Sequence, residues 1–216
     1  MNRLFYGIMI FAGIGIMMLG CYPKGPEYYS DLDITATQYD EDFKSDDGFS
    51  NSKYYWMPDS VNIQGNLDIT DTERRELEAL ILGELETQMG QRGYDRVDST
   101  QKDIVDLIIS SDVIGVNNSG AGWIPGGGWG WWGGGGWYYP PYWGGWYPYY
   151  YSYTTGTVIT TMGYIKDLDP DEENIPAVWM SVYDGLMSST RSNNRDRATK
   201  SIQQSFTQSP YLESTK

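Results

Sequence analysis

The sequence predicts an α+β domain: an antiparallel β-sheet with two helices packed on one face, plus a long Gly/Trp/Tyr-rich insert between two strands. Three observations predict this fold class. Segments typical of strands and helices follow in the order strands, helix, strands, helix, which favours helices gathered on one face of an antiparallel sheet. Residues 113–165 carry no charged side chain, although the chain holds 29 acidic and 15 basic residues. The length of 216 residues suits one domain with an appendage.

Residues 1–20 have the composition of a secretory signal peptide. Arg3 is the only charged side chain before Cys21, and the apolar run after it is too short and too rich in Gly to span a bilayer comfortably. The run ends in Met18-Leu19-Gly20-Cys21, which resembles the lipobox of bacterial lipoproteins, with Met18 and Leu19 departing from its usual residues. We therefore expect cleavage before Cys21, lipid attachment to its sulfur, and a tether over residues 21–30.

Lipid attachment at Cys21 would place the mature chain in the bacterial cell envelope. Two or three acyl chains together anchor a protein stably in a bilayer, whereas one does so only marginally. Tyr22 follows the cysteine instead of an aspartate, which favours the outer membrane. The expected partner at this position is the lipid bilayer itself.

The first predicted strand covers residues 31–39, where apolar and polar residues alternate. Residues 40–52 are rich in charge, Gly and Ser, and we expect an exposed loop there. A short aromatic strand follows at residues 53–57 and ends before Pro58.

The clearest predicted helix begins after Thr70. Thr70 and Glu73 have the spacing of a capping box, in which a hydroxyl and a carboxylate satisfy free N–H groups at the helix start. Apolar side chains then recur every four residues from Leu77 to Met89 and form one stripe. Gly90 and Gly93 offer places for the helix to end.

Four further strands and a second helix complete the prediction. A short strand is expected at residues 94–98, and residues 104–116 are apolar on both faces, which is typical of a central strand. Strands at 156–166 and 177–187 are joined by an acidic turn and form an antiparallel hairpin. The second helix covers residues 195–209, with apolar residues at every fourth position.

The domain, residues 31–216, contains a low-complexity aromatic insert at residues 117–153. Between residues 120 and 148 there are twelve Gly, seven Trp and four Pro, a composition that predicts a flexible excursion between paired strands. Trp and Tyr suit the headgroup zone of a membrane, the faces of sugar rings, or the hot spots of a protein interface. The remaining alternative is a tolerated insert that packs loosely on its own domain. The candidate contact residues are the seven tryptophans, Trp123, Trp129, Trp131, Trp132, Trp137, Trp143 and Trp146.

The composition excludes several classes of function. A formal net charge of −14 opposes binding to nucleic-acid phosphates. The chain has no His, which excludes Ser-His-Asp triads, Cys-His chemistry and His-ligated zinc. A single Cys excludes an intrachain disulfide and a four-cysteine metal site. What remains is an enzyme that uses carboxylates, or no enzyme.

The acidic and glycine-rich segments contain no recognisable site motif. Asp167-x-Asp169-x-Asp171 lacks the Gly and Glu that a calcium-binding loop needs, so we expect a solvated turn there. Gly126–Gly130 is followed by neither a Lys nor a helix start, and it is therefore no phosphate-binding loop. We expect no cofactor, no bound metal and no catalytic residue.

Four residues of the predicted strands are candidates for a functional role. Asp106 and Asp112 fall within the central strand, and we expect them at a strand face open to solvent. Tyr94 and Trp179 are expected to be core aromatics. The sequence thus predicts a non-enzymatic, lipid-anchored envelope protein whose insert contacts a membrane, a glycan or a partner protein. The alternative is a carboxylate-dependent enzyme that acts on envelope glycans.

The order of several short motifs resembles a family of bacterial lipoproteins that carry domain of unknown function 4136. Phe49-Ser-Asn-Ser-Lys-Tyr-Tyr-Trp56 is similar to the family segment DFSKYKTYAW, and Gly93-Tyr94 to its KGY motif. Gly156-Thr157-Val158-Ile159 and Val178-Trp179 are similar to its GTLVIDLVD…LVWRG strands. The resemblance covers about Leu32 to Tyr211. It implies this fold and an envelope location, and it implies no activity and no catalytic residues.

Overall fold

The structure is a computed structural model that describes residues 34–64, 67, 69–114, 137–138, 156–166, 168, 175–184 and 191–216. The predicted signal peptide, the tether and most of the insert lie outside these residues. No helix within the described ranges is long and apolar enough to cross a bilayer.

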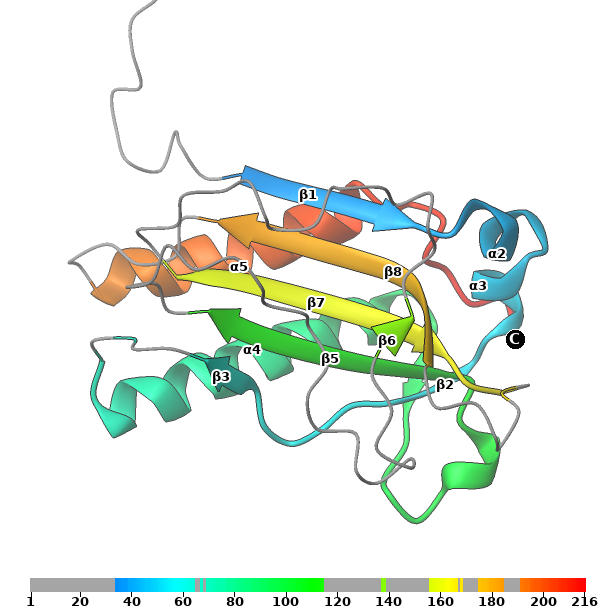
Figure 1. The fold of residues 1–216 in the computed structure, drawn as a ribbon, viewed down its shortest axis with the longest axis horizontal. Helices are drawn as coiled ribbons and strands as arrows, with labels where there is room; N and C mark the ends of the chain where they lie inside the picture. The colour runs from blue at the N-terminus through cyan, green and yellow to red at the C-terminus, as the bar shows by residue number, and fades with distance from the viewer. Residues whose placement is uncertain are drawn as a thin grey trace, which may run out of the picture. The chain divides into compact units, whose positions relative to one another are not determined.

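The centre of the domain is a mixed and mostly antiparallel sheet (Figure 1), which confirms the predicted fold class. Its strand order is β1-β8-β7-β5-β2-β4, while β3 pairs with β5 and β6 pairs with β8. The neighbours from β1 to β5 along this order are antiparallel. The pairings made by β2, β3, β4 and β6 are parallel. The strand bounds are β1 Ile34–Tyr39, β2 Tyr54–Trp56, β3 Asn62–Gln64, β4 Asp95–Arg96, β5 Leu107–Ile114, β6 Trp137–Tyr138, β7 Thr157–Tyr164 and β8 Ile175–Asp184.

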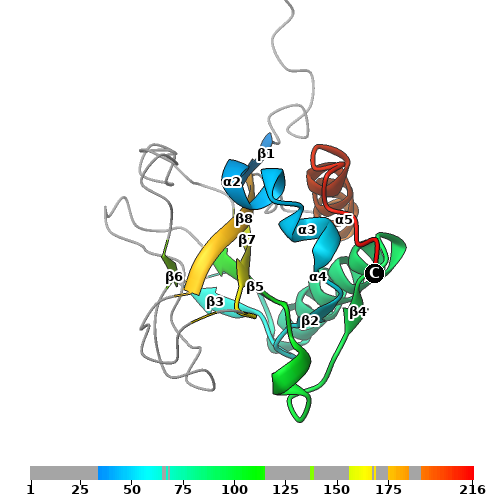
Figure 2. The same ribbon diagram turned by 90° about the vertical axis from the view of Figure 1, so that its right-hand side faces the viewer.

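Two long helices, α4 (Asp71–Gln91) and α5 (Arg191–Thr207), pack together on the same face of the sheet (Figure 2), as predicted. The predicted capping box is present at the start of α4. The Thr70 hydroxyl accepts a hydrogen bond from the Glu73 N–H at 3.3 Å, and the Glu73 carboxylate accepts one from the Thr70 N–H at 2.7 Å. Two otherwise free N–H groups are thereby satisfied.

The main hydrophobic core lies between the sheet and these helices. Ile81, Leu85 and Met89 of α4 are buried in it, together with the every-fourth-residue stripe of α5. Trp179 and Tyr94 are core aromatics, as predicted. The Trp179 indole N–H donates to Ser209 Oγ at 2.9 Å, and the Tyr94 hydroxyl donates to the Phe49 carbonyl at 3.0 Å, so each polar tip is paired as burial requires.

A second buried cluster covers the opposite face of the sheet. Ile108, Ile159 and Ala177 are fully buried there, and Met180 is nearly so. The alternate residues Leu107 and Ile109 of β5 belong to the helix-side core. Strand β5 is therefore covered on both faces, as its apolar sequence predicted.

The predicted exposed loop at residues 40–52 is wrong in part, because it contains two short helices. Helix α2 (Glu41–Ser45) begins where the Asp40 carboxylate accepts the Phe43 N–H at 2.9 Å, a typical N-cap. Helix α3 (Gly48–Asn51) buries Phe49 in the main core. One buried aromatic side chain orders a segment that charge alone would leave in solvent.

The structure differs from the prediction in one strand boundary and in two additional short strands. The central strand begins at Leu107, because Lys102–Ile104 forms a 3₁₀ turn, η2. Strand β3 was not predicted; it pairs with β5 in parallel. Strand β6 lies inside the insert, where no regular element was expected, and Trp137–Tyr138 pairs in parallel with Ile175–Pro176 of β8.

Candidate functional site

Most of the predicted site residues lie outside the described part of the chain. This holds for Cys21 and for every candidate tryptophan except Trp137. Trp137 belongs to β6, where its backbone pairs with Ile175. The described domain nevertheless fixes where the tether and the insert join it.

The tether and both ends of the insert join the sheet at one row of paired residues. Ile34, the first residue of β1, pairs with Asp184 of β8; Asp184 pairs with Thr157 of β7, and Thr157 with Ile114 of β5. The tether arrives at Ile34, and the insert leaves at Ile114 and returns at Thr157. We call this row the tether end of the sheet; it lies on the left in Figure 1.

Strand β6 holds the middle of the insert near the other end of the sheet. It pairs with Ile175, which precedes Asp184 by nine residues, or about 30 Å of extended strand. The segments before and after β6, residues 115–136 and 139–156, could reach about 70 Å and about 60 Å if fully extended. Both are longer than the span they must cross, and together they carry six of the seven candidate tryptophans.

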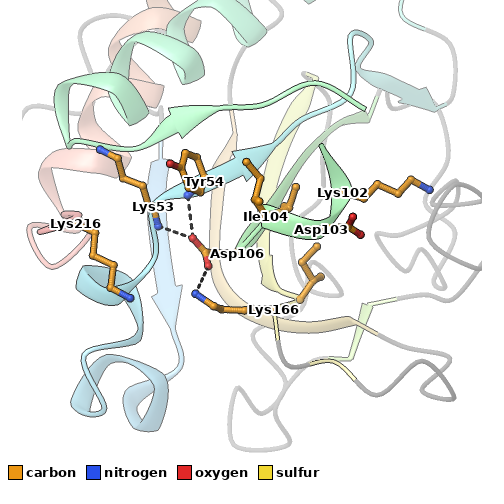
Figure 3. A pocket seen from close by; sticks show the side chains of 10 residues that line it. Lys53, Tyr54, Lys102, Asp103, Ile104, Asp106, Lys166 and Lys216 are labelled. Atoms are coloured by element: carbon orange, nitrogen blue, oxygen red, sulfur yellow. Dashed lines mark hydrogen bonds and ion pairs between the residues drawn. The ribbon is translucent and has the colours of Figure 1, made fainter. Parts of the chain in front are cut away.

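A pocket of about 500 Å³ opens at the end of the sheet opposite the tether end (Figure 3). It forms where β2 and β5 begin and β7 ends, so strand pairing gathers residues that are far apart in the sequence. We call it the Asp106 pocket. Its lining residues are Lys53, Tyr54, Lys102, Asp103, Ile104, Val105, Asp106, Ile165, Lys166 and Lys216.

Asp106 is the most buried charged side chain of this pocket, at 3% exposure. One carboxylate oxygen accepts the N–H groups of Lys53 at 2.7 Å and Tyr54 at 3.0 Å, and the other accepts the Lys166 ammonium at 2.7 Å. Burial opposes ionisation, but these hydrogen bonds and the Lys166 charge outweigh it and lower the pKa of Asp106. The expectation that Asp106 faces solvent is therefore wrong: it ties β2, β5 and the end of β7 together.

Asp112 was also expected at a solvent face, and it is also buried, at 2% exposure. Strand β3 covers it, and its carboxylate accepts Asn62 Nδ2 at 2.6 Å. Desolvation raises the pKa of Asp112 to about 6, although the Asn62 hydrogen bond acts in the other direction. Its environment thus raises its pKa, whereas the environment of Asp106 lowers the pKa of that residue.

These two buried carboxylates do not form a catalytic pair. Six residues of extended chain separate Asp106 from Asp112, or about 20 Å, whereas glycosidase carboxylates lie roughly 5–9.5 Å apart. Within the described residues, no group of three or more His, Cys, Asp or Glu side chains could hold a metal ion.

The lysines of the Asp106 pocket have different environments. The Lys53 ammonium points away from Asp106 (Figure 3); it donates to the Gly93 carbonyl at 2.9 Å and pairs with Asp95 at 3.2 Å. The Lys166 side chain is 47% exposed and pairs with Asp106. Lys102 and Lys216 line the pocket from η2 and from the C-terminal segment.

Comparison with known proteins agrees with this fold. The family model for a domain of unknown function (DUF4136) matches residues 35–211. The chain belongs to this family. The fold is also similar to the crystal structure of a DUF4136 family protein from Bacteroides thetaiotaomicron, with a TM-score of 0.59 and 26% sequence identity over 84% of this chain and 97% of that chain. Curated proteins include no match to the chain.

The DUF4136 match confirms the family that the motif order indicated. That order gave no indication of the Asp106 pocket, because its lysines stand at positions 53, 102, 166 and 216, with no shared local pattern. The chain has only seven lysines, and four of them line this pocket. Their proximity can be recognised only after β2, β5 and β7 are aligned in the sheet.

Proposed function

We propose that this DUF4136 protein is a non-enzymatic contact module of the bacterial envelope, held to the outer membrane by lipid on Cys21. Its aromatic insert makes contact with the bilayer surface to which the chain is tied. The residues Gly20-Cys21 after a short apolar leader support the anchor. Membership of a family of unknown function supplies no activity that argues against this proposal.

The observation that carries the proposal is the common tether end of the sheet. Ile34, Ile114 and Thr157 belong to one row of paired residues. A chain tied through residues 21–33 therefore brings the roots of the insert to the membrane side of the domain. Trp and Tyr gain most at that depth, where the ring meets acyl chains and the polar tip meets headgroups. This favours the membrane over a glycan or a partner protein.

The carboxylates of the domain support a non-enzymatic function. Asp106 holds backbone N–H groups in place, and Asp112 is buried against Asn62. Asp106 and Asp112 lie about 20 Å apart along the extended chain, which is too far for them to act together in acid–base cleavage of a glycan. Conversion of peptidoglycan fragments by the purified protein would contradict this part of the proposal.

Fluorescence quenching by brominated lipids tests the membrane contact. The native lipidated chain is placed in vesicles whose lipids carry bromine near the headgroup. Tryptophans at the bilayer surface should be quenched. Replacing Trp123, Trp129 and Trp146, the three candidates farthest in sequence from β6, with Ser should remove much of that quenching. Trp179 is fully buried and serves as an internal reference that lipid bromine does not reach.

Deletion of residues 120–148 gives the matched control. The membrane proposal predicts that quenching falls to the level of the buried reference. Quenching that is unchanged by the deletion would contradict the proposal. If the native chain shows no quenching, and its insert crosslinks to a glycan or a protein, that molecule and not the membrane is the partner of the insert.

A further inference from the structure

We propose that the Asp106 pocket binds an amphiphilic anion, a carboxylate or phosphate headgroup carried on an apolar chain. This inference does not depend on the anchor or on the insert. It rests on three properties of the pocket: its charge, its exposed apolar side chain, and its size and place in the fold.

The pocket concentrates positive charge in a strongly acidic protein. Four of the seven lysines line it with two aspartates in a chain whose net charge is −14. The Lys53 ammonium donates to the Gly93 carbonyl and pairs with Asp95 instead. The positive charge of the pocket therefore comes from Lys102, Lys166 and Lys216. One of the aspartates, Asp106, is buried and already accepts two backbone N–H groups. It also orients the Lys166 ammonium at 2.7 Å. The Asp106 carboxylate balances part of this charge, but the Lys166 side chain is 47% exposed, so its ammonium can also contact a negatively charged group of a ligand.

The pocket also presents apolar surface to solvent. Ile104 is 43% exposed, and among the described residues only Ile104 and Ile34 are large hydrophobic residues with this much exposure. Ile34 lies at the tether end. Val105 and Ile165 are buried apolar residues that also line the pocket. Exposed apolar surface inside a lysine-lined pocket is typical of a site for a ligand that has both an acidic and an apolar part.

Size and position are compatible with such a ligand. A volume of about 500 Å³ lies within the roughly 300–1,000 Å³ range of small-molecule sites. Asp106 and Ile165 adjoin the row Leu107–Tyr164, at the opposite end of β5 and β7 from the tether end. The pocket is therefore far from the junctions at Ile114 and Thr157.

Photo-crosslinking of the full chain in native membranes tests the inference. The probe is hexanoate that carries a diazirine, and modified peptides are mapped by mass spectrometry. We expect modification within residues 102–106 and 165–166. Excess hexanoate or hexyl phosphate should abolish it, whereas hexanol and acetate, which each lack one half of the ligand, should not. Competition by hexanol as strong as that by hexanoate would overturn the inference.

Substitutions locate the two halves of the site. Lys166→Gln should weaken labelling about tenfold, because a charge-assisted hydrogen bond is lost, and Lys166→Arg should restore it. Ile104→Ser should weaken it about threefold or more through lost apolar contact. Ile104 is half-exposed, so this variant remains informative even if Lys166→Gln unfolds. Lys200→Gln, an exposed lysine outside the pocket, is the matched control. Labelling unaffected by Ile104→Ser, or modification spread over other peptides, would also overturn the inference.

Discussion

Asp106, just before β5, and Asp112, within it, lie six residues apart, yet their surroundings shift their pKa values in opposite directions. Asp106 is buried with three hydrogen-bond donors, and its pKa is lowered. Asp112 is buried with one neutral donor, and its pKa is raised to about 6. The number and charge of the donors decide between these outcomes, since both carboxylates are desolvated.

The raised pKa of Asp112 predicts a loss of stability as pH rises. Between about pH 4 and pH 6 the folded state holds the proton that the unfolded state releases, so the free energy of unfolding falls across this window. At 1.36 kcal/mol per pKa unit, the loss amounts to roughly 2–3 kcal/mol. Asp112→Asn should therefore leave stability nearly unchanged at pH 4 and raise it at pH 7.5, measured by urea unfolding at both values.

Asp196→Asn is the control for this prediction. Asp196 is an exposed residue of α5, and its substitution should change the free energy of unfolding by less than about 0.5 kcal/mol at either pH. A stability difference between Asp112→Asn and the native chain that does not grow with pH would contradict the account of Asp112.

Sequence reasoning misplaced these two aspartates for a physical reason. Alternation along the central strand shows which residues share a face, but it does not show what covers that face. Asp106 is covered by β2 and Lys166, and Asp112 by β3. Both coverings are pairings between segments about 50 residues apart, which local periodicity cannot report.

Local signals gave the best predictions at the scale of single elements. The capping box of α4 and the apolar stripes of both helices depend on residues only three or four positions apart, so the sequence shows them directly. The end of α4 is similar: Gly93 has φ +82°, Tyr94 N–H donates to the Met89 carbonyl at 3.1 Å, and Gly93 N–H donates to the Gly90 carbonyl at 3.1 Å. This pattern is a Schellman motif.

Two glycines three residues apart should therefore respond oppositely to alanine. At Gly93 an added Cβ meets a left-handed backbone and the Ser214 carbonyl at 3.1 Å, so Gly93→Ala should lower the free energy of unfolding by about 1–2 kcal/mol or more. At Gly90 an added Cβ meets open space inside the helix, so Gly90→Ala should raise it by roughly 0.5–1 kcal/mol. Thermal or urea unfolding measures both; a change of the same sign at the two sites would contradict this account of the helix end.

Segments 40–52 and 102–104 show where element prediction failed. Helices α2 and α3 are too short for apolar periodicity to appear. They are held by the Asp40 cap and by Phe49, which packs edge-on against Phe43 at 4.8 Å between ring centroids. The turn at Lys102–Ile104 interrupts a run that otherwise reads as strand. The burial of Phe49 in the main core is a tertiary contact, which the local sequence does not indicate.

At the scale of the whole domain, the two regions for which we propose functions lie at opposite ends of the sheet. The tether end contains the junctions with the predicted tether and with both ends of the insert. The opposite end contains the Asp106 pocket. The order of strands and helices was predictable, because each segment carries its own pattern. The pocket was not, because it exists only where four distant segments meet.

The proposed lipid anchor would place these two ends relative to the envelope, and the rest of the proposed function depends on it. Two observations favour lipid attachment at Cys21: it follows a short apolar leader, and it is the only cysteine in the sequence. Acylation of this residue would turn the common junction at Ile34, Ile114 and Thr157 into the membrane side of the domain.

Mass spectrometry of the N-terminal peptide, from protein isolated with its native membranes, tests this claim most directly. We predict a peptide that begins at Cys21 and carries a diacylglyceryl group on sulfur, with further acylation at the new amino terminus where the organism adds it; Cys21→Ser should abolish the modification. An unmodified peptide that begins at Cys21, or a chain that retains residues 1–20 and is released in soluble form, would contradict the anchor and the function built on it.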